Sequence, residues 1–95
     1  MPATLVLRER ISLDERRFVE MVIWSLPTPL AGSAHTYKYR LALVMDEVCL
    51  LRYDNEAGKG DHKHLDAREM PYRFQGVDQL IEDFWTDVSH CGGST

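Results

Sequence analysis

The strongest fold signal of this chain is the segment HTYKYRLALVMDEVCLLRYD, residues 35–54. Its two halves, residues 35–45 and 48–54, are rich in the β-branched, aromatic and apolar side chains that are typical of strands. The polar pair Asp46–Glu47 between them predicts the tip of a β-hairpin. Because successive side chains of a strand point to opposite faces, the first half has two distinct faces. One face carries His35, Tyr37, Tyr39, Leu41 and Leu43, and the other carries Thr36, Lys38, Arg40, Ala42 and Val44.

The chain before this hairpin predicts another one. Residues 4–13 alternate well enough for a strand, and residues 18–26 are rich in β-branched and aromatic side chains. The polar residues 14–17 form a short connection between the two. Two prolines and a glycine within residues 27–34 then interrupt the pattern and indicate a loop.

The chain after the hairpin predicts short strands and a helix. HKHLDA (residues 62–67) and YRF (residues 72–74) are candidate strands. In residues 77–88 the apolar side chains recur at the spacing of one helical stripe, and Gly92–Gly93 would end the helix. The sequence therefore predicts an α+β fold, with an antiparallel sheet of four to five strands and one C-terminal helix packed on a face. Residues 1–95 would form a single domain, with residues 93–95 as a flexible tail.

Composition places the chain among ordinary folded proteins. Hydrophobic residues make up 44% and charged residues 27% of the chain. The apolar run near the N-terminus is too short for a signal peptide, and no run approaches the ~18 apolar residues of a membrane span. We therefore expect a cytoplasmic protein that does not contact membranes. Cys49 is expected to be buried in its apolar run, and Cys91 to be an exposed thiol.

The formal net charge of −4 argues weakly against a protein that coats nucleic acid through bulk charge. The charge is unevenly distributed, because residues 66–95 carry two positive and six negative side chains whereas residues 35–64 carry five of each. The middle segment also holds three of the four histidines. A local cationic pocket is therefore compatible with the acidic total.

The stretch RYDNEAGKGDHKH, residues 52–64, concentrates the polar chemistry of the chain. Its Asn55, Gly58 and Gly60 are explained by a turn. If the HKH segment is extended, His62 and His64 point to one side of it. Such a pair suits metal-free phosphodiester cleavage, because a neutral imidazole accepts the proton of a ribose 2′-hydroxyl and a protonated one donates to the leaving 5′-oxygen.

Cationic and acidic neighbours complete this candidate site. Lys59 and Arg52 would bind phosphate or the transition state, and Asp54 would orient one of the catalytic groups. The residues expected to line the same cleft and to bind substrate are Lys38, Arg40, His35 and Tyr37, with the aromatic rings of Tyr37, Tyr39 and Tyr53 available to stack on a base.

Two other interpretations of the same residues stay open. The H-x-H spacing also suits a metal site, which Asp54, Asp61 or His35 would complete, although the spacing does not dictate three ligands. The histidines would otherwise be solvated strand residues, and Arg52 and Asp54 a surface ion pair worth ~0–1 kcal/mol. We favour the metal-free site, which needs no cofactor.

Four segments in this order carry a family resemblance: GSAHTYKYRLALV (residues 32–44), CLLRYDNEAGKGDHKH (49–64), EMPYRF (69–74) and LIEDFWTDV (80–88). Together they resemble the TumE family of small bacterial and archaeal toxins, over well more than half of the chain. The resemblance implies a growth-inhibiting toxin that is held in check by a cognate helix-turn-helix antitoxin protein. Action on RNA is inferred by analogy with other small toxins.

Two hypotheses of different class follow. The chain is a type II toxin that acts as a metal-independent ribonuclease or on RNA in another way, with His62 and His64 as the acid–base pair. Alternatively, it is a non-catalytic binding protein that docks on a cellular target or partner through its sheet edge or its polar turn. An uncovered sheet edge would also allow a homodimer.

Overall fold

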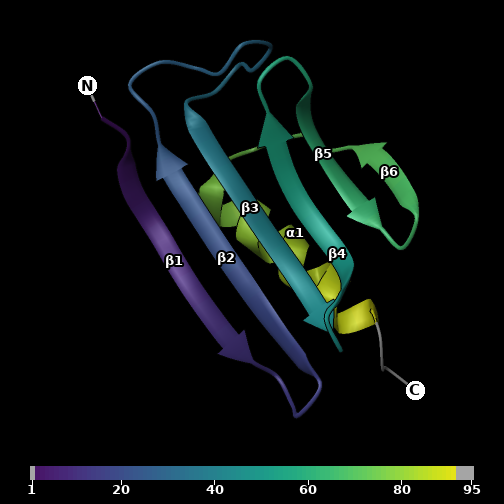
Figure 1. The fold of residues 1–95 in the computed structure, drawn as a ribbon. Helices are drawn as coiled ribbons and strands as arrows, with labels where there is room; N and C mark the ends of the chain where they lie inside the picture. Colours follow the sequence, from purple (N-terminus) through teal and green to yellow (C-terminus); the bar gives the residue numbers. More distant parts are fainter. Residues whose placement is uncertain (1, 92–95) are drawn as a thin grey trace.

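The computed structural model describes residues 2–91, and within them it contains a meander of six strands followed by one helix (Figure 1). The elements are β1 (Thr4–Ser12), β2 (Arg17–Ser25), β3 (Tyr37–Met45), β4 (Val48–Glu56), β5 (Gly60–Leu65), β6 (Arg68–Pro71) and α1 (Val77–His90). Each strand pairs antiparallel with the next, so the order across the sheet is β1-β2-β3-β4-β5-β6. The predicted α+β fold with a C-terminal helix on one face of an antiparallel sheet is confirmed.

The strand count differs from the expected four to five because of β6. Residues 72–74, expected as a strand, lie outside the sheet, and the preceding residues Arg68–Pro71 pair with β5 instead. A two-residue turn at Asp66–Ala67, with φ 57° at Asp66, joins the two strands. Pro71 lacks an N–H group, so it suits the end of an edge strand.

The tip of the central hairpin is the predicted pair Asp46–Glu47. Both residues have positive φ, 49° and 67°, which is the backbone of the two-residue turns whose twist matches that of the flanking strands. Asp46 also receives an ion pair from Arg16, and its N–H donates to the Arg16 carbonyl at 3.0 Å. These contacts connect the turns of the first two hairpins.

The core lies between α1 and one face of the sheet. The helix crosses behind β3 and β4 in Figure 1 and presents the buried side chains Leu80, Phe84 and Val88. Alternation supplies the opposing surface from the strands. The buried strand residues are Val19, Met21 and Ile23 of β2, Tyr39, Leu41 and Leu43 of β3, and Leu51 and Tyr53 of β4. The other face of the sheet, which we call the open face, has no helix over it within residues 2–91.

Both expectations for the cysteines are wrong. Cys49 is exposed, because a register shift in the pairing of β3 and β4 skips Leu50 and aligns Cys49 with Val44, whose side chain lies on the face away from the core. Cys91 is half-buried, since it packs beside Leu50 and Leu65.

Helix α1 ends at His90, and the N–H of Cys91 bonds to the Val88 carbonyl at 3.1 Å. The predicted stop at Gly92–Gly93 and the predicted tail 93–95 lie outside the described residues. Among the residues that are described, no helix combines the length and apolar character needed to cross a membrane.

Candidate functional site

Five polar side chains meet on the open face where β4, β5 and β6 lie side by side. Strand register aligns Asp54 with His62, and in the adjacent row it aligns Arg52 with His64 and His64 with Glu69. Positions two apart on a strand share a face, so both rows project to the same side. We call Arg52, Asp54, His62, His64 and Glu69 the histidine cluster.

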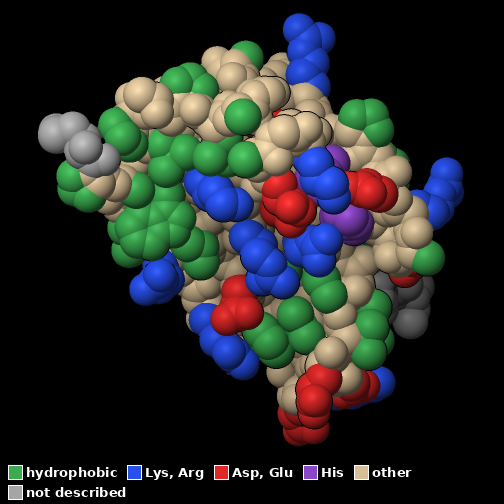
Figure 2. Space-filling model, turned by 45° about the horizontal axis from the view of Figure 1, so that its top comes forward, with side chains coloured by type: hydrophobic (Ala, Val, Ile, Leu, Met, Phe, Trp, Pro, Cys, Tyr) green, Lys and Arg blue, Asp and Glu red, His purple; other side chains and the backbone are tan. Residues whose placement is uncertain are grey.

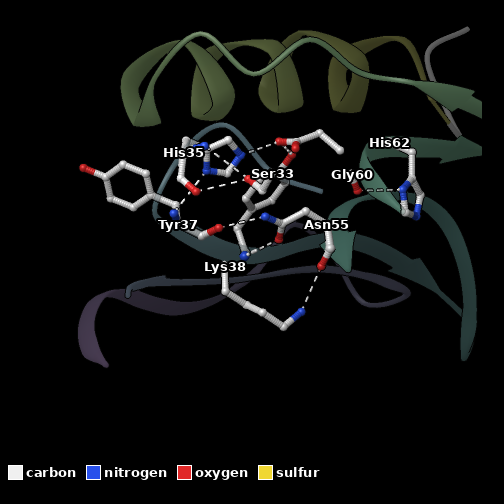
Figure 3. A network of polar contacts seen from close by, with 9 residues as sticks. Ser33, His35, Tyr37, Lys38, Asn55, Gly60 and His62 are labelled. Carbon is white, nitrogen blue, oxygen red and sulfur yellow. Dashed lines mark hydrogen bonds and ion pairs between the residues drawn. The ribbon is translucent and has the colours of Figure 1, made fainter. Parts of the chain in front are cut away.

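His62 lies at the centre of this cluster, with only 6% of its side chain exposed. Its Nδ1 is 3.2 Å from the carbonyl oxygen of Gly60, drawn in Figure 3. A carbonyl oxygen only accepts hydrogen bonds, so Nδ1 carries a proton. The other nitrogen, Nε2, then faces two carboxylate oxygens, Oδ1 of Asp54 at 3.0 Å and Oε2 of Glu69 at 3.3 Å. Both of these neighbours of Nε2 are hydrogen-bond acceptors.

His64 lies in the opposite hydrogen-bonding situation. The Arg52 guanidinium places a terminal nitrogen 3.0 Å from His64 Nε2. Since a guanidinium only donates, His64 Nε2 uses its lone pair to accept this hydrogen bond. The two imidazole rings are 5.1 Å apart between centroids and lie edge to face. The nearest polar partner of Nε2 is thus a carboxylate at His62 and a guanidinium at His64.

The acidic member Asp54 is only partly satisfied. Its Oδ2 is 3.1 Å from Arg52 Nε and its Oδ1 is 3.0 Å from His62 Nε2, which are ion-pair distances. The angles are not those of hydrogen bonds, however, and the three buried atoms Arg52 Nε, Asp54 Oδ1 and His62 Nε2 have no hydrogen-bond partner among the described residues. Buried polar atoms in this state cost free energy, and they are uncommon outside functional sites.

The remaining cations predicted for the site are Arg40, Lys59 and Lys38, and they differ in their surroundings. Arg40 is exposed and is aligned with Asp54 on the open face. Lys59, from the turn between β4 and β5, borders a hollow of about 400 Å³ together with His62 and Glu69. Lys38 is also on the open face, but its amine donates to the Asn55 carbonyl at 2.9 Å.

His35 and Tyr37 do not join this cleft, contrary to the expectation. His35 Nε2 is 2.8 Å from Asp61 Oδ2, and its ring stacks on Phe74 at 3.9 Å between centroids. Tyr37 packs against the edge of the core. Odd-numbered residues of this segment share the face of buried Tyr39, so they lie on the helix side of the sheet.

Sequence analysis assigned Asn55 to a turn, but the structure places it fully buried in β4. Its side-chain oxygen accepts from the Tyr39 N–H at 3.0 Å, and its side-chain amide donates to the Tyr37 carbonyl at 2.7 Å (Figure 3). These two bonds continue the link between β3 and β4 beyond the last aligned pair, Arg40 and Asp54. We call this arrangement the Asn55 clamp.

Glu69 is the cluster residue that sequence analysis missed. It belongs to β6, a strand that carries no alternating apolar pattern. The signal that would have found it is the two-residue turn at Asp66–Ala67, because a hairpin closed there aligns Glu69 with His64.

Cations of three strands gather on the open face. Arg8 and Arg10 of β1 project to the open face, where they lie over the rings of Trp24 at 5.9 Å and Phe18 at 4.0 Å. Together with the cations of β3 and β4 they form a band that we call the basic band: Arg8, Arg10, Lys38, Arg40 and Arg52. Figure 2 shows Lys and Arg side chains gathered beside histidines and carboxylates. Helix α1 on the other side carries four acidic residues and no Lys or Arg.

The buried tyrosines are structural donors. Burial, reinforced by hydrogen bonds to carboxylates, raises the pKa of Tyr39, Tyr53 and Tyr72 far above the usual value. Their hydroxyls donate to Asp61, Asp87 and Asp83, respectively. These phenols therefore stay neutral at physiological pH, and they lie on the face away from the histidine cluster.

The comparison with protein families supports the resemblance noted from the sequence. The family model described as Toxin TumE matches residues 2–90. No curated protein and no solved structure matches the chain.

Proposed function

Because the chain belongs to the TumE family of toxins, we propose that it is the toxin of a type II toxin–antitoxin system and that it inhibits growth by cleaving RNA on its open face. Membership of a toxin family implies an antitoxin partner, for which we propose a helix-turn-helix protein. The proposed site of action is the cytoplasm, and the proposed reaction needs no metal or cofactor. The support comes from the basic band and the histidine cluster.

The basic band supports RNA binding despite the net charge of −4. Its five cations come from three strands and lie on the face that carries no helix within the described residues. Cations that follow a groove hold phosphates, while aromatic rings stack on bases. The aromatic residue suited to stacking here is Trp24, which borders a hollow with Lys38 and Arg40. Tyr39 and Tyr53, considered for this role from sequence, are 1% exposed and are not accessible to a base.

The histidine cluster supports proton transfer. His64, whose Nε2 holds a lone pair, would accept the proton of the ribose 2′-hydroxyl once RNA displaces Arg52 from it. His62, whose Nε2 faces Asp54 and Glu69, would in its protonated form donate a proton to the leaving 5′-oxygen. Arg52 would then stabilise the charge that develops on phosphorus, and Lys59 and Arg40 would hold the adjoining phosphates. Each proton-transfer role contributes about 10²–10⁴-fold to the rate.

The single observation that carries this proposal is the pair of imidazoles, 5.1 Å apart between centroids and flanked by Asp54 and Arg52, on the face that bears the basic band. A turn that only reversed the chain would not require the two imidazole rings to lie side by side, and it would not require His62 to be buried.

The test replaces His62 and His64 together with Gln and compares the variant with His90→Gln. His90 is exposed at the end of α1, far along the chain from the cluster, and serves as the matched histidine control. Cells that express the wild type or the control should arrest, and sequencing of RNA 5′ ends should show new termini. The double variant should lose both effects while still folding and binding the antitoxin.

A fully toxic double variant would overturn the catalytic proposal. Toxicity without new RNA 5′ ends would support the alternative of a binding protein that docks on a target. Purified protein, assayed on RNA in the presence of EDTA, tests separately whether the reaction is independent of metal.

A further inference from the structure

We propose that Asp54, His62, His64 and Glu69 also form a binding site for one divalent transition-metal ion of the zinc class, and that the bound ion inhibits the toxin. Metal binding itself rests only on the geometry of the cluster. The inhibitory effect rests on the proposed ribonuclease function.

The first support is the convergence of four donor atoms. His62 Nε2 lies 3.0 Å from Asp54 Oδ1 and 3.3 Å from Glu69 Oε2. His64 Nε2 lies 4.0 Å and 3.5 Å from the same two oxygens. A tetrahedral ion with bonds of about 2.0–2.1 Å to nitrogen and oxygen separates its ligands by about 3.3 Å. The ligand atoms of Asp54, His62 and His64 also lie within 4.8 Å of one another.

The second support is that the buried atoms at the centre have no hydrogen-bond partner. His62, only 6% exposed, directs Nε2 toward Asp54 Oδ1, and neither atom has a hydrogen-bond partner among the described residues. A cation between them would satisfy both. Two imidazoles with two carboxylates form a ligand set that suits zinc and similar ions rather than magnesium or calcium.

The neighbouring contacts are those that orient metal ligands. Histidines that bind a metal commonly donate their other N–H to a carbonyl or carboxylate, and His62 Nδ1 does so to Gly60. Arg52 Nε approaches Asp54 Oδ2 at 3.1 Å and leaves Oδ1 facing the histidines. Both contacts remain possible when an ion is bound.

Binding requires one rearrangement. The terminal nitrogen of Arg52 must leave His64 Nε2, which it approaches to 3.0 Å. The Arg52 side chain is 31% exposed and has room to turn outward. The ion therefore competes with Arg52 for His64 Nε2. It would occupy both nitrogens that the proposed reaction uses, which is why it should inhibit.

The experiment titrates metal-free protein with Zn²⁺ by calorimetry and, in parallel, with Co²⁺, whose visible absorption reports tetrahedral coordination. The wild type should bind one equivalent of each ion. Glu69→Gln, at a half-exposed side chain that the fold does not depend on, should weaken binding about tenfold or more. His64→Gln should weaken it at least as much.

The matched control is His35→Gln, which alters a histidine–aspartate pair on the helix side of the sheet, away from the histidine cluster. This variant should bind Zn²⁺ as tightly as the wild type. Absence of a stoichiometric site in the folded wild type would overturn the inference, as would equal weakening in His35→Gln or unchanged binding in Glu69→Gln.

Activity assays separate this inference from the proposed function. Protein stripped of metal with EDTA and then freed of the chelator is used. RNA cleavage by this protein that one equivalent of Zn²⁺ abolishes would support both. Stoichiometric Zn²⁺ binding by a protein that never cleaves RNA would uphold the metal site and refute the ribonuclease. Cleavage by the stripped protein that saturating Zn²⁺ leaves unchanged would overturn the inhibitory role.

Discussion

Replacing Asn55 with Ala should strongly destabilise the fold without removing any residue of the open face. The Asn55 clamp supplies the partners of two backbone groups of β3, the N–H of Tyr39 at 3.0 Å and the carbonyl of Tyr37 at 2.7 Å. Asn55 itself has no exposed surface. Alanine at this position would leave both backbone groups without a partner.

The expected cost follows from those two groups. Each buried donor or acceptor that loses its partner costs about 1–3 kcal/mol, so the free energy of unfolding should fall by about 2–6 kcal/mol. The total for a small domain is about 5–15 kcal/mol, so the loss is a large fraction of it. Entry of a water molecule into the vacated space would bring the effect toward the lower limit.

Urea unfolding followed by circular dichroism measures this loss as a lower midpoint at an unchanged slope. The matched control is Gln79→Ala, which removes an amide on the helix surface that bonds to Asp83 at 2.8 Å. A loss for Asn55→Ala below about 1 kcal/mol, or no larger than that of the control, would refute the role of the clamp. At a temperature where the variant is folded, RNA cleavage should be retained.

Three further predictions test other features. Glu47→Gly should raise the free energy of unfolding by up to about 1 kcal/mol in thermal melts, because φ 67° strains a residue with a Cβ; a lower melting temperature would contradict this. Arg40→Ala should weaken RNA binding and lower the slope of log affinity against log salt by about 0.7, whereas Arg68→Ala, on the helix side of β6, should change neither. The three buried tyrosines have a higher pKa in the folded than in the unfolded chain, so their neutral phenols stabilise the fold fully at a pH below the unfolded tyrosine pKa of about 10. This stabilisation is lost as the pH rises above that value. Tyrosinate absorbance should therefore appear together with loss of the circular dichroism signal, and ionisation in the still-folded chain would refute this for Tyr39, Tyr53 and Tyr72.

Features with a strong local signal were predictable from sequence. The central hairpin combines two apolar segments with a two-residue polar tip, and the structure has its turn at Asp46–Glu47. Helix α1 carries a stripe with a 3.6-residue period, and Leu80, Phe84 and Val88 of that stripe are buried. The hairpin and the helix each need only to bury one apolar face. The spacing of apolar residues along the sequence is therefore enough to predict these elements.

Features that depend on pairing between segments were not predictable in this way. Strand β6 has four residues, two of them charged, and it is defined by its bonds to β5 rather than by its own composition. Glu69 enters the histidine cluster only through that pairing. Asn55 looks like a turn residue in sequence, and its burial follows from the need to satisfy the backbone of β3.

The candidate site was predictable to the extent that side-chain alternation determines it. His62 and His64 were expected on one side, and the structure places their rings 5.1 Å apart there. His35 was expected in the same cleft although alternation already placed it on the face of Tyr39, and the structure has it on that face. Arg8 and Arg10 reach the same face as Arg40 through the register of two hairpins, which sequence distance conceals.

The sequential strand order has a consequence for how the chain folds. Every pairing in the sheet joins neighbours along the chain, so each pair can close over a loop of two to eleven residues as soon as its second strand has been synthesised. The apolar surface of these hairpins is covered only when α1 follows. During translation the chain would thus pass through a stage in which the sheet is fully hydrogen-bonded but its apolar face is still exposed to solvent. At this stage the apolar face would be most accessible to chaperones or to the antitoxin.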